Sequence, residues 1–129
     1  VSGWNAKEAG IFTTKNNDKA NEKPYKIVLY HASDGTVKDV TEANSNQAFF
    51  TLCQSSSGDW YYFDQTDTEM ILYAMDANFT SKRTVKTFSL SEIPCNLSDC
   101  GMTIMNNRIY FYTMPDSRTS TVLYRYDIV

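Results

Sequence analysis

The chain has 129 residues, the size of one domain, and its 12 basic and 15 acidic side chains give a formal net charge of −3. This mildly acidic composition lacks the cationic field that attracts nucleic acid, and no window approaches the run of about 18 apolar residues that marks a membrane span. Hydrophobic residues make up 42% of the chain, so a core can form, whereas one His and five Gly are too few for most catalytic or phosphate-binding motifs. We therefore expect a folded domain that is not an enzyme, with no cofactor and no metal.

Three runs of bulky residues align without gaps and predict the first strand of a repeated unit. They begin at Ile11, Trp60 and Ile109, and the interval from the first run to the second equals that from the second to the third. Each run opens with β-branched or aromatic residues and ends at an aspartate. These aspartates are Asp18, Asp67 and Asp116.

A second motif, Leu-Tyr, follows each run after a polar stretch of variable length and predicts the returning strand. It occurs as Leu29-Tyr30, Leu72-Tyr73 and Leu123-Tyr124, and an aspartate follows soon after as Asp34, Asp76 and Asp127. A third motif, Thr-Val-Lys, is found over residues 36–38 and 84–86, and its third copy would fall beyond Val129. Asp34-Gly35 is a tight-turn dipeptide that leads to the first Thr-Val-Lys strand.

One unit is therefore predicted to be an antiparallel β-meander, and the chain a single domain of three such repeats, over about 1–46, 47–94 and 95–129. We expect helical turns at most over 6–9 and 42–48, the latter capped by Thr41. A weak strand is expected over Val1 to Ala6. The other strands should lie near residues 11–14, 27–31, 36–38, 48–53, 60–64, 70–75, 84–88, 102–105, 109–113 and 121–126.

A single meander cannot bury both of its faces, so the units must pack on their neighbours. Radial packing gives a β-propeller, and threefold closure gives a β-trefoil, in which Val1 to Ala6 would complete the third unit. Because the third unit lacks its last strand, we favour a partial propeller, with the trefoil as the alternative. The open ends of such a stack would expose apolar faces lined by Tyr61, Phe63, Tyr110 and Tyr112, so the chain should self-associate or pack against a protein partner or further blades.

Residues 58–63, followed by residues 71–76, resemble the tyrosine-rich blades of extracellular β-propellers, both the cell-surface repeats of bacteria and those of the low-density lipoprotein receptor type. The pattern returns over 107–112 with 123–127, and more weakly over 29–35. This resemblance implies a secreted or cell-surface module that binds or scaffolds other proteins. Since the chain begins at Val1, either a leader was removed or the segment was excised.

Carbohydrate binding is the alternative function. Arg108 before Ile109-Tyr110 resembles the Arg-aromatic strand of fungal fucose-binding propeller lectins, although Leu123-Tyr124 stands where that family carries Glu. A sugar could stack on Trp60 or Tyr62, and Arg108 and Tyr110 would belong to the same kind of site. The competing interpretation is structural: four consecutive aromatic residues, 60–63, put two side chains on each face of a sheet that is covered on both sides.

The remaining candidates have structural interpretations that we favour. His31 is the lone imidazole and has no nucleophile motif beside it, and the repeated aspartates would accept local backbone hydrogen bonds at turns. Cys53 lies in an apolar run and is predicted to be a buried strand residue. Cys95 and Cys100 either form a small-loop disulfide or stay free thiols, and possible glycosylation sites at Asn78 and Asn96 agree with secretion.

Overall fold

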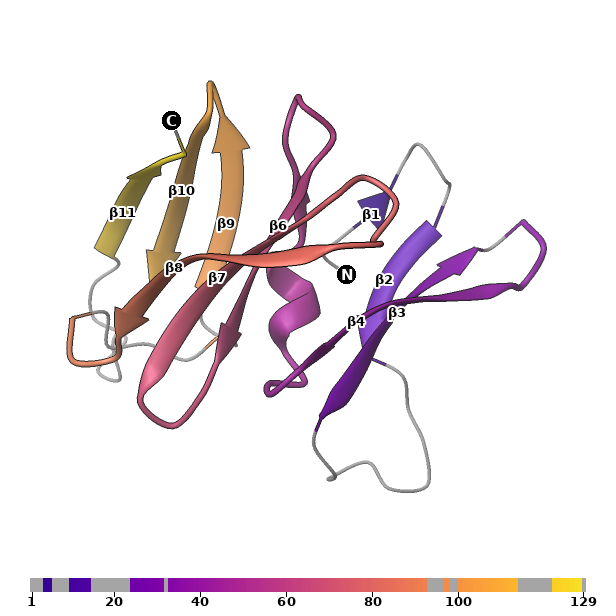
Figure 1. Cartoon of the computed structure of the whole chain (residues 1–129), viewed down its shortest axis with the longest axis horizontal. Coiled ribbons are helices and arrows are strands. Elements are labelled where there is room, and N and C mark those ends of the chain that lie inside the picture. Colours follow the sequence, from indigo (N-terminus) through magenta and orange to yellow (C-terminus); the bar gives the residue numbers. More distant parts are fainter. Residues whose placement is uncertain are drawn as a thin grey trace.

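The protein is all-β, and its strands form three antiparallel sheets that lie side by side (Figure 1). This computed structural model describes residues 4–5, 10–14, 24–31, 33–92, 97, 100–113 and 122–128. In each sheet, strands that are consecutive in the chain are neighbours, so each is a meander. None of the three sheets closes on itself within the described ranges.

Each sheet draws its strands from one stretch of the chain. Sheet 1 contains β1 (Trp4–Asn5), β2 (Gly10–Thr14), β3 (Tyr25–His31) and β4 (Val37–Ala43). Sheet 2 contains β5 (Cys53–Gln54), β6 (Trp60–Gln65), β7 (Glu69–Met75) and β8 (Lys82–Ser89). Sheet 3 contains β9 (Cys100–Met105), β10 (Arg108–Thr113) and β11 (Val122–Asp127).

These strands confirm the predicted ones, with one exception. Residues 48–51 form the 3₁₀ helix η1 (Ala48–Thr51), and the strand that follows is only two residues long. The Thr51 hydroxyl explains this, because it donates to the carbonyl oxygen of Ala48 at 2.9 Å and accepts from the backbone N–H of Phe63 at 2.8 Å. The buried hydrogen bonds of Thr51 thus outweigh the β-propensity of residues 48–51 and favour a 3₁₀ helix over a strand.

The helical turn predicted over 42–48 was also wrong in position, because η1 begins only at Ala48. Thr41 lies within β4, and the residue that precedes η1 is Gln47, whose side chain makes no capping hydrogen bond. The other predicted turn, over 6–9, lies outside the described residues. In the part of the chain that the structure describes, no helix is long and apolar enough to cross a membrane.

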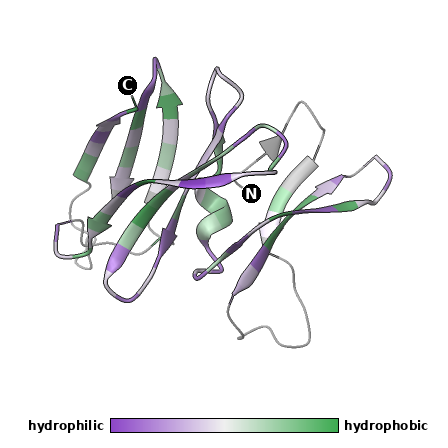
Figure 2. Ribbon diagram, viewed as in Figure 1, coloured by the Kyte–Doolittle hydropathy of each residue, from purple (hydrophilic) through white to green (hydrophobic). Residues whose placement is uncertain are grey.

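The outer strands β4 and β8 share an irregularity. In each strand, one valine has no partner in the neighbouring strand, although the residues on either side of it are paired. This residue is Val40 in β4 and Val85 in β8. Such a bulge bends an edge strand and hinders pairing with other chains. Along β8, polar residues dominate, whereas β7 is mostly apolar (Figure 2).

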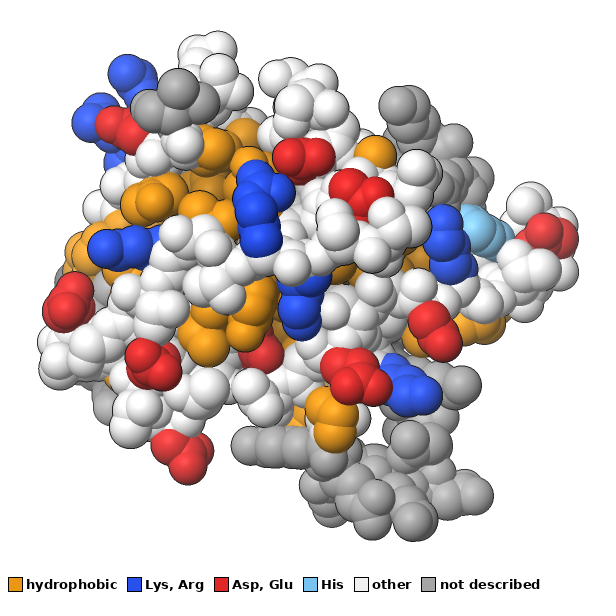
Figure 3. All heavy atoms as spheres, in the orientation of Figure 1, with side chains coloured by type: hydrophobic (Ala, Val, Ile, Leu, Met, Phe, Trp, Pro, Cys, Tyr) orange, Lys and Arg blue, Asp and Glu red, His pale blue; other side chains and the backbone are white. Residues whose placement is uncertain are grey.

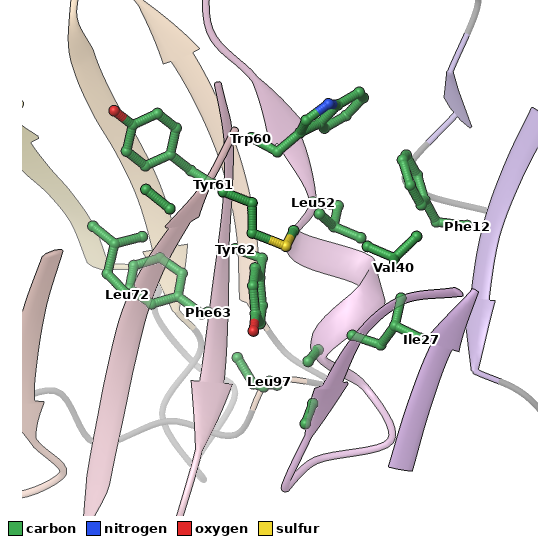
Figure 4. Packing of buried hydrophobic residues seen from close by; sticks show 14 of the residues in the cluster. Phe12, Ile27, Val40, Leu52, Trp60, Tyr61, Tyr62, Phe63, Leu72 and Leu97 are labelled. Atoms are coloured by element: carbon green, nitrogen blue, oxygen red, sulfur yellow. The ribbon is translucent and has the colours of Figure 1, made fainter. Parts of the chain in front are cut away.

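The core lies between the sheets, with sheet 2 in the middle (Figure 4). Alternation along β6 turns Trp60 and Tyr62 toward sheet 1, and Tyr61 and Phe63 toward sheet 3. All four side chains are buried. This confirms the interpretation in which both faces of the sheet are covered, and it corrects the expectation that Tyr61 and Phe63 line an exposed face.

Candidate functional site

The three sheets present equivalent faces to one another. We call the face of a sheet that is turned toward the next sheet along the chain its forward face, and the opposite one its backward face. Sheet 3 has no following sheet, so its forward face is the one turned away from sheet 2. Phe12 of sheet 1 contacts Trp60 of sheet 2 with ring centroids 5.0 Å apart, and Phe63 of sheet 2 contacts Phe111 of sheet 3 at 4.9 Å. Each junction therefore joins a forward face to a backward face.

The Leu-Tyr motif places the same residue types on the same faces in all three sheets. Its leucine lies on the forward face, opposite an aromatic residue of the preceding strand, in the pairs Phe12–Leu29, Phe63–Leu72 and Tyr112–Leu123. The four residues of the first two pairs are 0% exposed, whereas Tyr112 is 45% and Leu123 is 69% exposed. The forward pair of sheet 3 thus has the composition of a buried pair without the burial.

The motif tyrosine lies on the backward face. In sheets 2 and 3 it stacks on the aromatic residue opposite it, Tyr73 on Tyr62 at 5.3 Å and Tyr124 on Phe111 at 5.1 Å between ring centroids. Tyr73 and Tyr124 are both partly buried, whereas Tyr30 of sheet 1 is 42% exposed. The backward face of sheet 1 is therefore the second place where a motif residue meets solvent.

We call the forward face of sheet 3 the open face. By the register of β9, β10 and β11, its side chains are those of Thr103, Met105, Arg108, Tyr110, Tyr112, Leu123, Arg125 and Asp127. The Asp127 carboxylate pairs with the guanidinium Nε of Arg108 at 3.4 Å and with that of Arg125 at 3.3 Å. An ion-paired group thus stands beside the exposed apolar side chains.

A glycine shapes the apolar part of the open face. Gly101 lies opposite Tyr112, and a Cβ atom added at Gly101 would be 2.3 Å from the Cε1 atom of that ring. The tyrosine ring therefore lies against the glycine backbone, where any other residue would displace it.

The structure separates the four residues that the sequence put forward for ligand binding. Arg108 and half-buried Tyr110 lie together on the open face. Trp60 and Tyr62 lie between sheets 1 and 2, in the packed core (Figure 4). The hydroxyl of Tyr62 accepts a hydrogen bond from the Lys82 ammonium at 3.1 Å, and burial raises the pKa of this tyrosine.

Polar contacts join sheet 1 to sheet 2 at the edge of the aromatic core. The buried Asp64 carboxylate accepts hydrogen bonds from the backbone N–H groups of Asn44 at 2.8 Å and Ser45 at 2.9 Å. Nearby, the Lys82 ammonium lies 4.5 Å from the ring centre of Tyr73 and donates to the hydroxyl of Thr41 at 3.2 Å. Burial lowers the pKa of Lys82.

A polar cavity of about 300 Å³ opens beside this junction. It is lined by Tyr25, Asn44, Ser45, Asn46, Gln65, Thr66 and Asp67. No hydrogen bond engages the side chains of Asn44 and Asp67 or the hydroxyl of Tyr25 within the described part of the protein. Amide, carboxylate and phenol groups are therefore available to a polar ligand.

The structure places the other candidates in turns or at strand ends. Half-buried His31 contacts the Thr36 hydroxyl at 3.1 Å through Nδ1, and Asp34 accepts the backbone N–H of Thr36 at 2.9 Å. Asp67 is exposed, and Asp18 and Asp116 lie outside the described residues. No group of three or more potential metal ligands occurs among the residues that the structure places.

The cysteines and glycosylation motifs are only partly placed. Cys53 lies in β5, half-buried rather than buried as predicted, and burial raises the pKa of its thiol. Asn78 is exposed in the turn between β7 and β8. The possible disulfide between Cys95 and Cys100 and the second motif at Asn96 lie outside the described residues, apart from the backbone of Cys100.

Sequence reasoning missed Asp64 and Leu123. Asp64 directly follows four aromatic residues and lies within the strand expected over 60–64, but its burial depends on the segment after β4. Leu123 belongs to a motif that the sequence shows, but its exposure depends on which sheets are neighbours.

No protein-family model matches the sequence, and no curated protein is a significant match to it.

Mixed charge covers one side of the molecule. Figure 3 shows basic and acidic side chains interspersed over it, with hydrophobic side chains exposed between them on the side of sheet 3. Because neither sign of charge dominates, this surface offers no broad field for a polyanionic ligand.

Proposed function

We propose that the chain is a non-catalytic interaction or scaffold module, secreted or at the cell surface, built from propeller-like blades. The observation that carries this proposal is the forward pair Tyr112–Leu123, which is exposed although the equivalent residues of sheets 1 and 2 are fully buried. A partner that covers this apolar pair would explain why the described residues leave both side chains exposed.

The chemistry of the open face favours another β-sheet as that partner. In both junctions within the chain, the forward aromatic–leucine pair meets a backward face rich in aromatic residues. The open face has the same pair, flanked by the Arg108–Asp127 ion pair, which suits the polar rim of an interface. A further blade, from this protein or another, would bury Leu123 as sheet 2 buries Leu29.

A chain extended by a second copy of residues 47–94 after Val129 tests this proposal. The added unit should fold against the open face, slow amide hydrogen exchange in β11 and reduce the binding of an apolar fluorescent dye. The matched control carries the same extension with Leu123→Glu, and its added unit should stay unfolded. Unchanged exchange in β11, together with an unfolded extension in both chains, would contradict a docking role for the open face.

Carbohydrate binding is a second candidate because of the polar cavity. The side chains of Asn44 and Asp67 can engage neighbouring hydroxyl groups, Tyr25 offers an aromatic ring, and none of the described residues that line the cavity is basic. A neutral sugar fits this lining better than an anionic one. Binding on a glycan array that Asn44→Ala and Asp67→Ala abolish, and that Glu92→Ala leaves intact, would support this function. If Arg108→Ala abolishes binding instead, the sugar occupies the open face.

A further inference from the structure

We propose that the partner of the open face is a second copy of this chain, which docks through the backward face of its sheet 1. This inference rests on the proposed function and names its partner. The two surfaces carry the motif leucine and the motif tyrosine on the same faces as in the two junctions of the chain, although the tyrosine of sheet 1 has Ile11 and Val37 opposite it instead of an aromatic residue.

Each of the two surfaces presents one residue of the Leu-Tyr motif. The open face presents the motif leucine, Leu123, with its aromatic neighbour Tyr112, as sheets 1 and 2 do at their forward faces. The backward face of sheet 1 presents the motif tyrosine, Tyr30, with Val37 opposite it, and both are exposed. In sheets 2 and 3, the same tyrosine lies on the face that packs against the preceding sheet.

The charged side chains described on the two surfaces give them opposite net charge. By register and alternation, the charged side chains described on the backward face of sheet 1 are Lys26, Asp39 and Glu42, which leave one net negative charge. Those on the open face are Arg108, Arg125 and Asp127, which leave one net positive charge. The two surfaces therefore attract rather than repel each other, whereas two copies of either surface carry like net charge.

The number of sheets in each copy limits how many copies can form a closed ring. A contact between two different surfaces is head-to-tail, so it makes either a ring or an open chain. Closed propellers have about four to eight blades, and each copy brings three sheets. Two copies give six sheets, and no other number of copies falls within that range. The expected assembly is consequently a closed dimer in which each open face covers the partner's sheet 1.

Light scattering after size-exclusion chromatography, over a wide range of concentrations, measures the assembly. We expect a mass of twice 14.7 kDa that does not grow further as concentration rises. The variants Leu123→Glu and Tyr30→Lys, each at an exposed position, should both be folded monomers, and mixing them should restore association, because one intact interface and one Glu–Lys contact can form. If either variant misfolds, Met105→Glu and Val37→Lys replace it on the same faces.

Three outcomes overturn the proposal. A native chain that stays monomeric at every concentration excludes the second copy, while the extended chain above still tests the open face on its own. Loss of the dimer in Leu123→Glu but not in Tyr30→Lys indicates pairing of two open faces. Growth into ever larger assemblies excludes closure by two copies.

Discussion

Sheets 2 and 3 are built from the same motifs and differ in what surrounds them. In β6, the first five residues are buried, because sheet 1 covers one face and sheet 3 the other. In β11, residues from Leu123 onward alternate between exposed and half-buried, because only the face toward sheet 2 is covered. The motifs therefore determine the register and the face of each residue, whereas burial depends on how many neighbouring sheets there are.

The two junctions also differ in chemistry. Between sheets 2 and 3 the contacts are largely aromatic, with the rings of Phe63, Phe88, Phe111 and Tyr126 in mutual contact. The junction of sheets 1 and 2 adds polar contacts through Asp64 and Lys82 at its edge. Such polar contacts fix one relative position of two sheets more tightly than apolar packing does, because hydrogen bonds are directional.

Truncation of the motif leucine should strongly destabilise the protein in sheet 2 and hardly affect it in sheet 3. Leu72→Ala should lower the free energy of unfolding by about 2–5 kcal/mol, since it leaves a cavity between sheets 2 and 3. The same change at Leu123 should stay within about 0.5 kcal/mol, because the side chain is exposed in the monomer. Urea unfolding at a protein concentration that keeps the chain monomeric measures both variants.

Equal losses of unfolding free energy for the two variants would contradict this expectation, because they would mean that Leu123 is packed within its own chain. A large loss at Leu123 that appears only at high protein concentration would instead point to burial in an assembly. Phe63→Ala and Tyr112→Ala form a second matched pair at the aromatic positions opposite the two leucines.

Removal of the buried carboxylate tests the polar junction. Asp64→Ala should lower the free energy of unfolding by about 2 kcal/mol, because the backbone N–H groups of Asn44, Ser45 and Gln65 lose their charged acceptor and regain water only in part. Asp67→Ala, three residues on and exposed, is the matched control and should have little effect. Urea unfolding again provides the measurement, and equal stability of Asp64→Ala and the native chain would show that water replaces the carboxylate.

Much of the fold could be predicted from the sequence, since repetition reinforces weak local signals. The Leu-Tyr motif identified β3, β7 and β11, and alternation along 60–63 correctly put two aromatic residues on each face of β6. The 3₁₀ helix η1 could not be predicted, because its residues favour strands and a contact of Thr51 with β6 decides the outcome.

The candidate site was predictable only in part. Arg108 and Tyr110 were placed correctly on one strand, but nothing local indicates that Tyr61 is buried whereas Tyr110 is only half-buried. That difference arises from sheet 3, which covers Tyr61, and no motif in the sequence states which sheets touch. Nothing local indicates that Asp64, at the end of the strand expected over 60–64, is buried, because the segment after β4 folds over it and donates two backbone N–H groups to its carboxylate.

The aspartates that follow the Leu-Tyr motifs have different hydrogen-bond and ion-pair partners in the three sheets. Asp34 and Asp76 accept hydrogen bonds within their turns, and hydrogen bonds from Thr36 and from Thr80 respectively lower the pKa of each carboxyl. Asp127, the equivalent in sheet 3, pairs with arginines instead. The Thr80 hydroxyl donates to Asp76 at 2.5 Å, while the backbone N–H groups of Thr80 and Ser81 donate at 2.6 and 2.9 Å.

Thr80→Val removes one of these three donors and should raise the pKa of Asp76 toward its ordinary value of 3.8 without reaching it, because both backbone donors remain. A lowered pKa means that the ionised carboxylate stabilises the fold above pH 3.8, and that this stabilisation is lost as the pH falls through the lowered pKa. The variant should therefore lose less stability on acidification than the native chain. Carboxyl-carbon NMR titration measures the pKa directly, with Asp34 as the internal control, and an unmoved Asp76 would show that the backbone donors alone hold its charge.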